Sequence, residues 1–188
     1  MQFVVKHLGF TTARGRFTDI QGTIHCGDKV NLAAASVEVT IAAAGIATGG
    51  SQRDAYLCST DFLDVERYPT ISFTSTRVER MTKDRLGVIG DLSIRGVTRQ
   101  VMLETTCTGR GTNPWGQEVV GFTARTRLRM NRKAYGLTWN ATLESGGLFL
   151  GGTLDIHIEL QAAKQMTPAG CRRVRHLTLL EIPVMKRG

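Results

Sequence analysis

Apolar and polar residues alternate with a period of two along most of this 188-residue chain. Residues 37–41, 71–75 and 154–160 show the alternation most clearly. Because successive side chains of a β-strand point to opposite faces of the sheet, this pattern predicts strands with one apolar face. The segments between them are too short for the crossovers that parallel strands need. The pattern therefore predicts an all-β chain whose sheet is antiparallel.

The number of alternating segments, about eight, favours a closed arrangement. Meandering strands joined by hairpins close naturally into an up-and-down barrel, because closure removes the exposed sheet edges. We expect an eight-stranded antiparallel barrel over residues 1–165. A barrel of this size is wide enough for one small or thin ligand.

Residues 53–76 are the place where the period changes. Before Pro69 the apolar residues fall closer to helical spacing than to alternation. Ser59 and Thr60 offer hydroxyl groups that suit a helix N-cap. Pro69 stops any helix, and alternation resumes directly after it. We therefore expect one short helical segment near 54–68 that leads into a strand.

The alternation also predicts which residues point into the barrel. The inward candidates carry almost no charge, so they either pack shut as a core or enclose a hydrocarbon chain, and the pattern leaves both alternatives open. His7 falls on the same parity as the apolar residues of the first strand. The predicted lining consists of Phe3, Val5, His7, Phe17, Val39, Ile41, Phe73, Leu92, Phe122, Leu128, Leu154 and Ile156.

The formal net charge of +8 is unevenly distributed. Residues 166–188 hold five basic residues and one acidic residue, which is half of the excess. We interpret them as a basic, mobile C-terminal tail. Arg125, Arg127 and Arg129 share one face of a predicted strand. They either keep the outer surface hydrated or, together with the tail, bind an anionic surface or nucleic acid.

Several function classes lack support in the sequence. No apolar run approaches the roughly 20 residues that a membrane-spanning helix needs. The first ten residues do not resemble a signal peptide, so we expect a cytoplasmic protein, or a periplasmic or secreted one if the true start lies upstream. The four cysteines have no metal-site or disulfide spacing. No catalytic motif accompanies the four histidines, so we expect no enzyme; a hydrolase or isomerase would show turnover that His7→Ala abolishes.

Four blocks in order carry a family resemblance: FVVKHLGFTTARGRFTDIQGTI, RDAYLCSTDFLDVERYPTISFTST, GDLSIRGVTRQVMLE and VGFTARTRLRMNRKAYGL. In these blocks the chain resembles the YceI-like polyisoprenoid-binding family of bacteria, over roughly residues 2–162. The resemblance implies a lipocalin-like barrel that holds a long isoprenoid or a similar amphiphile. The chain departs from the family in carrying Tyr56 where a histidine is common. It also departs in its basic tail.

The resemblance implies a carrier or sequestering protein whose ligand is the lipid itself, with no cofactor and no metal. We name Arg53, Asp54 and Arg14 as candidates for contact with a polar headgroup. For Arg53 and Asp54 a structural alternative stays open, in which the pair ties the helical segment to a neighbouring loop. A homodimer is also possible.

Overall fold

A computed structural model describes residues 1–8, 11–26, 35–112, 114, 116, 118–140, 150–164 and 175–180. At residues 26, 107, 110, 118–131, 153, 154, 160–164 and 175–180 it describes the backbone alone. The elements in these ranges are β1 (Gln2–His7), β2 (Thr11–Phe17), β3 (Ile20–Cys26), β4 (Ser36–Ala42), η2 (Ala43–Gly45), β5 (Ile46–Ala47), α1 (Ser51–Cys58), β6 (Thr70–Arg80), β7 (Arg85–Ile94), β8 (Val97–Thr112), β9 (Glu118–Asn131), η3 (Arg132–Tyr135), β10 (Leu150–Lys164) and β11 (Arg175–Leu180).

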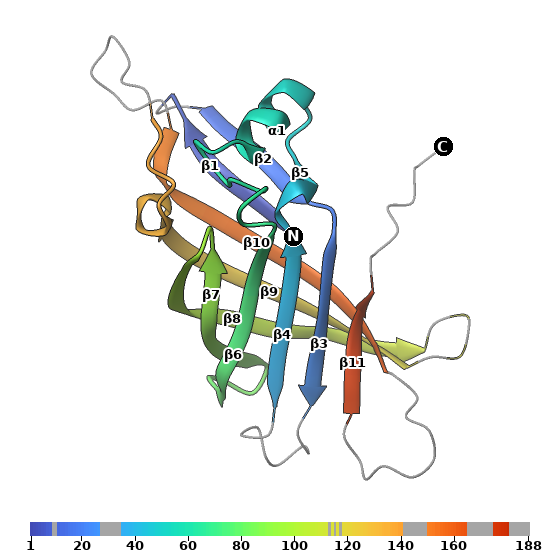
Figure 1. The fold of residues 1–188 in the computed structure, drawn as a ribbon. Coiled ribbons are helices and arrows are strands. Elements are labelled where there is room, and N and C mark those ends of the chain that lie inside the picture. Colours follow the sequence, from blue (N-terminus) through green and yellow to red (C-terminus); the bar gives the residue numbers. More distant parts are fainter. Residues whose placement is uncertain are drawn as a thin grey trace.

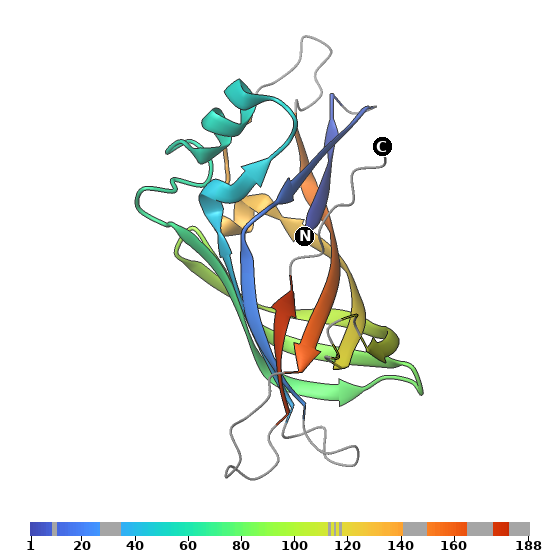
Figure 2. The ribbon, with the colours of Figure 1, turned by 90° about the vertical axis from the view of Figure 1, so that its right-hand side faces the viewer.

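All of these strands belong to one sheet, and every pair of neighbours is antiparallel, in the order β11-β3-β4-β6-β7-β8-β9-β10-β1-β2-β5. β11 also pairs with β10. Because β11 pairs with β3 on its other side, the series of paired strands from β3 to β10 is closed by β11. The eight strands β3, β4 and β6 to β11 share this ring, and the ribbon views show them curving around one interior (Figures 1 and 2). The all-β prediction is therefore confirmed.

β2 and β3 form one bent ribbon rather than two separate strands. Between them the backbone of Thr18 donates to the carbonyl of Gly45, and the carbonyl of Asp19 accepts from the amide of Ala42. These hydrogen bonds satisfy the backbone where the strand ladder breaks. The bend directs β2 toward β1 and β5, and β3 toward β4 and β11.

The helical segment exists, but it begins and ends earlier than the sequence predicts. α1 spans Ser51–Cys58 and is over before the expected N-cap residues. The hydroxyl of Ser59 donates back to the carbonyl of Tyr56, so it closes α1 instead of opening a new helix. A positive φ of 51° at Asp64 then prevents helical continuation, and residues 59–67 form turns. β6 begins directly after Pro69, as expected.

The predicted C-terminal tail also differs from the structure. Arg175–Leu180 form β11, which pairs with a neighbour on each side, so this part of residues 166–188 belongs to the sheet. Residues 165–174 and 181–188 lie outside the described part of the chain. The sequence pattern did not predict β11, because the segment is short and one of its two partners, β3, lies near the other end of the chain.

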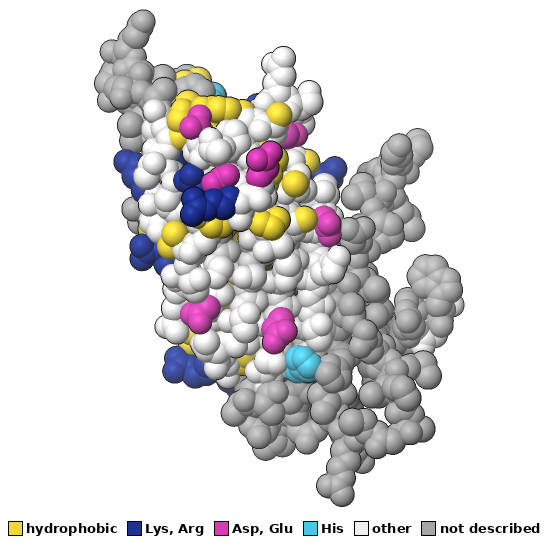
Figure 3. All heavy atoms as spheres, viewed as in Figure 1, with side chains coloured by type: hydrophobic (Ala, Val, Ile, Leu, Met, Phe, Trp, Pro, Cys, Tyr) yellow, Lys and Arg dark blue, Asp and Glu magenta, His cyan; other side chains and the backbone are white. Residues whose placement is uncertain are grey.

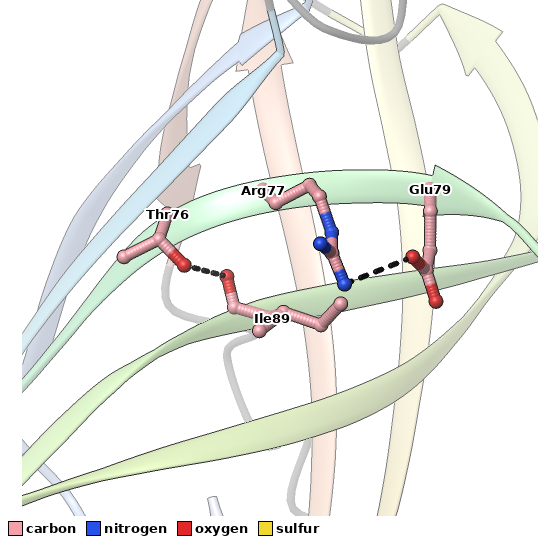
Figure 4. A network of polar contacts seen from close by, with 4 residues as sticks. All are labelled: Thr76, Arg77, Glu79 and Ile89. Atoms are coloured by element: carbon pink, nitrogen blue, oxygen red, sulfur yellow. Dashed lines mark hydrogen bonds and ion pairs between the residues drawn. The ribbon is translucent and has the colours of Figure 1, made fainter.

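β6 bends over the barrel at a β-bulge. Its register against β7 shifts between Ser75 and Arg77, which leaves Thr76 as the extra residue. The hydroxyl of Thr76 donates to the carbonyl oxygen of Ile89 at 3.3 Å (Figure 4). Next to it, Arg77 Nη2 lies 3.3 Å from Glu79 Oε2 in an exposed ion pair (Figure 4). The bulge increases the curvature that closing a barrel requires.

Gly90 faces this bulge from β7, and a side chain at this position would force its neighbours to shift. A Cβ at Gly90 would lie 2.4 Å from the carbonyl oxygen of Thr74 and 2.7 Å from the Phe73 ring. Both distances are shorter than van der Waals contact allows. The close approach lets the Phe73 ring cover the glycine, and Phe73 itself is buried.

Most of the buried apolar side chains of the described residues fall into two clusters. The first core cluster lies under η2, η3 and the turn after α1, and consists of Phe17, Ile41, Ala43, Ile46, Leu63, Ile71, Ile94, Tyr135 and Leu137. The second core cluster, Phe73, Val78 and Val88, lies farther along β6 and β7. One end of the barrel, the end near η2 and η3, is therefore filled by packed side chains.

Candidate functional site

The register of the strands confirms the parity on which the predicted lining rests. Phe3 pairs with Ile156, Val39 pairs with Phe73, and Phe73 pairs with Leu92, so these residues share one face of the sheet. Of the predicted lining, Val5, Phe17, Ile41, Phe73 and Ile156 are buried, whereas Phe3, His7, Val39 and Leu92 are half-buried.

Three members of the predicted lining lie where side chains are not described: Phe122, Leu128 and Leu154. The backbone register places Leu154 opposite Val5 and Phe122 opposite Leu160, and Leu128 falls in the bulge between β9 and β10.

A group of inward-facing apolar residues beside the second core cluster stays half-buried, and two of them, Val39 and Leu92, also pack against the first core cluster. The group lies on β4, β7 and β8 and packs partly against the second core cluster. We call this group the far-half wall; it consists of Val37, Val39, Leu92, Val101 and Leu103. An apolar side chain that faces the inside of a barrel and remains accessible is available to a hydrocarbon ligand, because burying it further is favourable. Val37, Val101 and Leu103 were absent from the predicted lining although they lie on the same alternating face.

A polar recess lies at the other end of the β2–β3 ribbon. Its volume is about 620 Å³, and it lies between the first half of β2 and the loop that enters α1. The recess is lined by His7, Thr11, Thr12, Ala13, Arg14, Thr48 and Arg53. Two of the predicted headgroup candidates, Arg14 and Arg53, thus meet here from separate elements. The third, Asp54, is not among the lining residues.

Arg53 and Asp54 are organised around Thr48. Arg53 donates from Nε to Thr48 Oγ1 at 2.6 Å and from Nη2 to the Thr48 carbonyl at 2.7 Å. Asp54 Oδ1 accepts from the Thr48 amide at 2.9 Å and from its hydroxyl at 2.5 Å. These contacts connect α1 to the preceding loop. Arg53 and Asp54 therefore have the structural role that the sequence left open as an alternative. They also hold Arg53 in place at the recess.

His7 has a hydroxyl group as its neighbour. Its Nδ1 lies 3.2 Å from Thr11 Oγ1, and that hydroxyl donates to the His7 carbonyl oxygen. Among the described residues that line the recess, none is a carboxylate or a cysteine. The recess therefore offers positive charge and hydroxyl groups, which suit an anionic or polar group.

The first core cluster separates the recess from the far-half wall. Along the β2–β3 ribbon the recess spans Thr11 to Arg14, Phe17 of the first core cluster follows, and β3 then runs beside the far-half wall, since Gly22 pairs with Val39. The apolar and polar sites are thus two regions of one barrel.

Comparison with known proteins decides the family. The YceI-like domain model matches residues 1–162. The chain belongs to the YceI-like family. Protein YceI of Escherichia coli O157:H7 is 39% identical over 130 residues, which is 69% of this chain and 67% of that protein.

Two solved structures agree with the YceI-like fold. The YCEI protein of Campylobacter jejuni has a TM-score of 0.68 at 24% identity, over 86% of this chain and 90% of that one. A polyisoprenoid binding domain from Saccharophagus degradans has a TM-score of 0.63 at 15% identity, over 85% and 90% of the two chains. Identities this low show the shared fold alone.

Two arginines have structural roles in this YceI-like barrel that the sequence did not predict. Arg132 is only 3% exposed and donates to the carbonyls of Leu137, Trp139 and Gly151. Arg95 donates to backbone carbonyls on two other segments of the chain. The sequence around each arginine is typical of a solvated turn. No local pattern indicates that the side chain donates to carbonyls on other segments of the chain.

The three arginines that were predicted to share one face, Arg125, Arg127 and Arg129, lie on β9, whose side chains are outside the described part of the structure. Register places Arg125 between Glu104 and His157, both of which are exposed. On the face shown in Figure 3, basic and acidic side chains of the described residues are interspersed. Binding of nucleic acid or an anionic surface stays a prediction. Among the described residues, no helix has the length and apolar character to cross a membrane.

Proposed function

We propose that this protein binds an isoprenoid or similar long amphiphilic lipid, with the hydrocarbon chain against the far-half wall. The observation that carries the proposal is the set of inward apolar side chains that remain half-buried there. Burial of a hydrocarbon contributes roughly 0.8 kcal/mol per methylene group removed from water. The name of the Saccharophagus degradans neighbour, a polyisoprenoid binding domain, supports the choice of lipid class.

The polar recess is the proposed contact for a headgroup. Arg14 and Arg53 supply positive charge from β2 and α1, and threonine hydroxyls surround them. A few polar groups near an apolar surface are the usual means of orienting a ligand. Because the first core cluster lies between, a ligand that contacts both regions must be long, which agrees with a polyisoprenoid.

Native mass spectrometry of freshly purified protein, followed by organic extraction, tests the proposal first. We expect a prenyl or fatty amphiphile in stoichiometric amount. Delipidated protein is then titrated with a fluorescent prenyl alcohol. Protein that carries no lipid and takes up no prenyl probe would rule out the proposal and show that the interior is a packed core.

A pair of tryptophan variants on β4 locates the site. Val39 faces inward and is half-buried, whereas its neighbour Thr40 is exposed on the outer face. Val39→Trp fills the far half, so we expect at least tenfold weaker binding of the prenyl alcohol. Thr40→Trp adds the same group outside, so its affinity should match the unmodified protein. Equal affinities of the two variants would place the lipid elsewhere.

The recess is tested by headgroup selectivity. Arg14→Gln and Arg53→Gln should weaken binding of a prenyl phosphate while leaving the prenyl alcohol unaffected, since the two ligands share the hydrocarbon chain and only the phosphate carries negative charge. An equal loss for both ligands would indicate a purely structural role for these arginines.

A further inference from the structure

Two strands from opposite ends of the chain share one position in the sheet. Along β10, β1 pairs with Leu150–His157 and β11 pairs with Gln161–Lys164. Along the β2–β3 ribbon, β1 pairs with Thr11–Arg16 and β11 pairs with Thr23–Cys26. Since β1 and β11 are each antiparallel to both neighbours, they run in the same direction. They therefore lie in line, with the C-terminal end of β11 leading toward the N-terminal end of β1.

The distance between the two strands follows from the register. Leu180 is opposite Gln161, and Gln2 is opposite His157, so four residue steps of β10 separate them. At the strand rise of about 3.3 Å per residue this is about 13 Å. β11 and β1 together thus form one barrel strand with a short gap, and β11 completes the part that β1 does not reach.

Both neighbours of β11 give it the same orientation in the barrel. On β3, Leu177 is opposite Ile24, which in turn pairs with Val37 of the far-half wall. On β10, Leu179 is opposite Ala162, which has the inward parity of Ile156. The positions of Leu177 and Leu179 therefore fall on the inner face from both sides, whereas Leu180 falls on the outer face. β11 borders the same space as the proposed lipid site.

β11 has short pairings on both of its sides. It pairs over four positions with each neighbour, whereas β9 and β10 pair over ten. Segments with few pairings open at lower free energy than the rest of a structure. A chain that enters from the opposite end of the barrel must pass the first core cluster before it reaches the far-half wall.

We propose that β11 is a detachable strand of the barrel, and that its release from β3 and β10 opens a lateral entrance to the far-half wall. Through this opening a long hydrocarbon chain enters sideways and does not thread past the first core cluster. Because β11 stays covalently connected to β10 when it is released, it returns when the ligand is in place. This inference rests on the proposed lipid binding, for which it supplies the route.

Hydrogen exchange of the ligand-free protein tests the opening without any lipid. We expect the amides of β11, together with those amides of Thr23–Cys26 and Gln161–Lys164 that point toward β11, to exchange at least tenfold faster than those in the centre of β7 and β8. Exchange of β11 at the rate of β7 would overturn the proposal, because β11 would then open only with the whole barrel.

A reversible lock tests the route. Arg175 is opposite the native Cys26, so Arg175→Cys places two cysteines at directly paired positions, whose separation suits a disulfide. The variant is made together with Cys171→Ser to remove a competing thiol. We expect oxidation to slow uptake of the fluorescent prenyl alcohol at least tenfold, and reduction to restore it. The matched control carries Cys26→Ser as well, and its uptake should not respond to oxidation.

The outcomes separate the two proposals. Uptake by the oxidised lock at the reduced rate would overturn the lateral entrance while leaving lipid binding intact. Fast exchange of β11 in a protein that takes up no prenyl alcohol in either redox state would refute lipid binding, and with it the need for an entrance.

Discussion

Replacement of the buried Arg132 by methionine tests how this barrel holds η3 in place. The side chain is 3% exposed and sits where β9 ends. Nε donates to Gly151 at 3.1 Å, and Nη1 donates to Leu137 at 2.9 Å and to Trp139 at 2.7 Å. All three acceptors are backbone carbonyls, so one side chain ties the start of β10 to the segment after η3.

The expected loss of stability follows from these bonds. A hydrogen bond from a charged donor contributes about 1.5–3 kcal/mol, so three give at least about 4.5 kcal/mol. Part of this is offset, because burial of the guanidinium carries a desolvation penalty that lowers the pKa of Arg132 and that methionine removes. In addition, Nη2 is buried and has no hydrogen-bond partner in the described part of the chain. We expect Arg132→Met to reduce the free energy of unfolding by about 3 kcal/mol, a large share of the 5–15 kcal/mol typical of a domain.

Urea unfolding followed by circular dichroism measures this loss. With an m-value of about 2 kcal/mol/M, the midpoint should fall by about 1.5 M with m unchanged. Arg132→Lys keeps the charge, but its side chain reaches fewer carbonyls. Its urea midpoint should therefore lie between those of the unmodified protein and Arg132→Met. Arg77→Met is the matched control, because its ion pair with Glu79 is exposed and should contribute less than about 1 kcal/mol (Figure 4). A loss for Arg132→Met no larger than for this control would refute the reasoning.

Three further changes test other parts of the barrel. Gly90→Ala forces the Phe73 ring and the β6 backbone apart, so the free energy of unfolding should fall by about 1–3 kcal/mol; no measurable change in urea would contradict the close approach. Arg95→Met removes two charge-assisted hydrogen bonds between segments and should cost about 2 kcal/mol in the same assay. Burial, and then the negative charge of Asp54, raise the pKa of the Cys58 thiol. Less thiolate forms at a given pH, so alkylation of Cys58 at pH 8 should be slower than in urea-unfolded protein, and Asp54→Asn should accelerate it.

The recess shows how far sequence reasoning reached at the candidate site. Arg14 and Arg53 could be named as headgroup contacts from the sequence, and the structure brings both to one recess. Their proximity depends on β2 lying beside the loop before α1, a contact that no local pattern predicts. The hydrogen bonds of Asp54 to Thr48 were likewise only one of two open alternatives.

Alternation by itself determined the fold class and the inner face of the strands. The physical reason is local: in an extended chain successive side chains point to opposite sides, so an apolar residue at every second position marks the face that avoids water. The hairpin at Arg95 and Gly96 is equally local, because φ values of 50° and 72° suit a two-residue turn.

Only the tertiary structure decided how the barrel is completed. β1 is too short to pair with the far parts of β3 and β10, which leaves their edges open there. Leu177–Leu180 fill this position, and the sequence alone does not show that it exists. Arg132 reads as a surface residue until the carbonyls of segments up to 19 residues away converge on it. In both cases at least one stabilising partner, β3 for β11 and Gly151 for Arg132, lies on another element of the chain, so the chain must fold before that interaction exists.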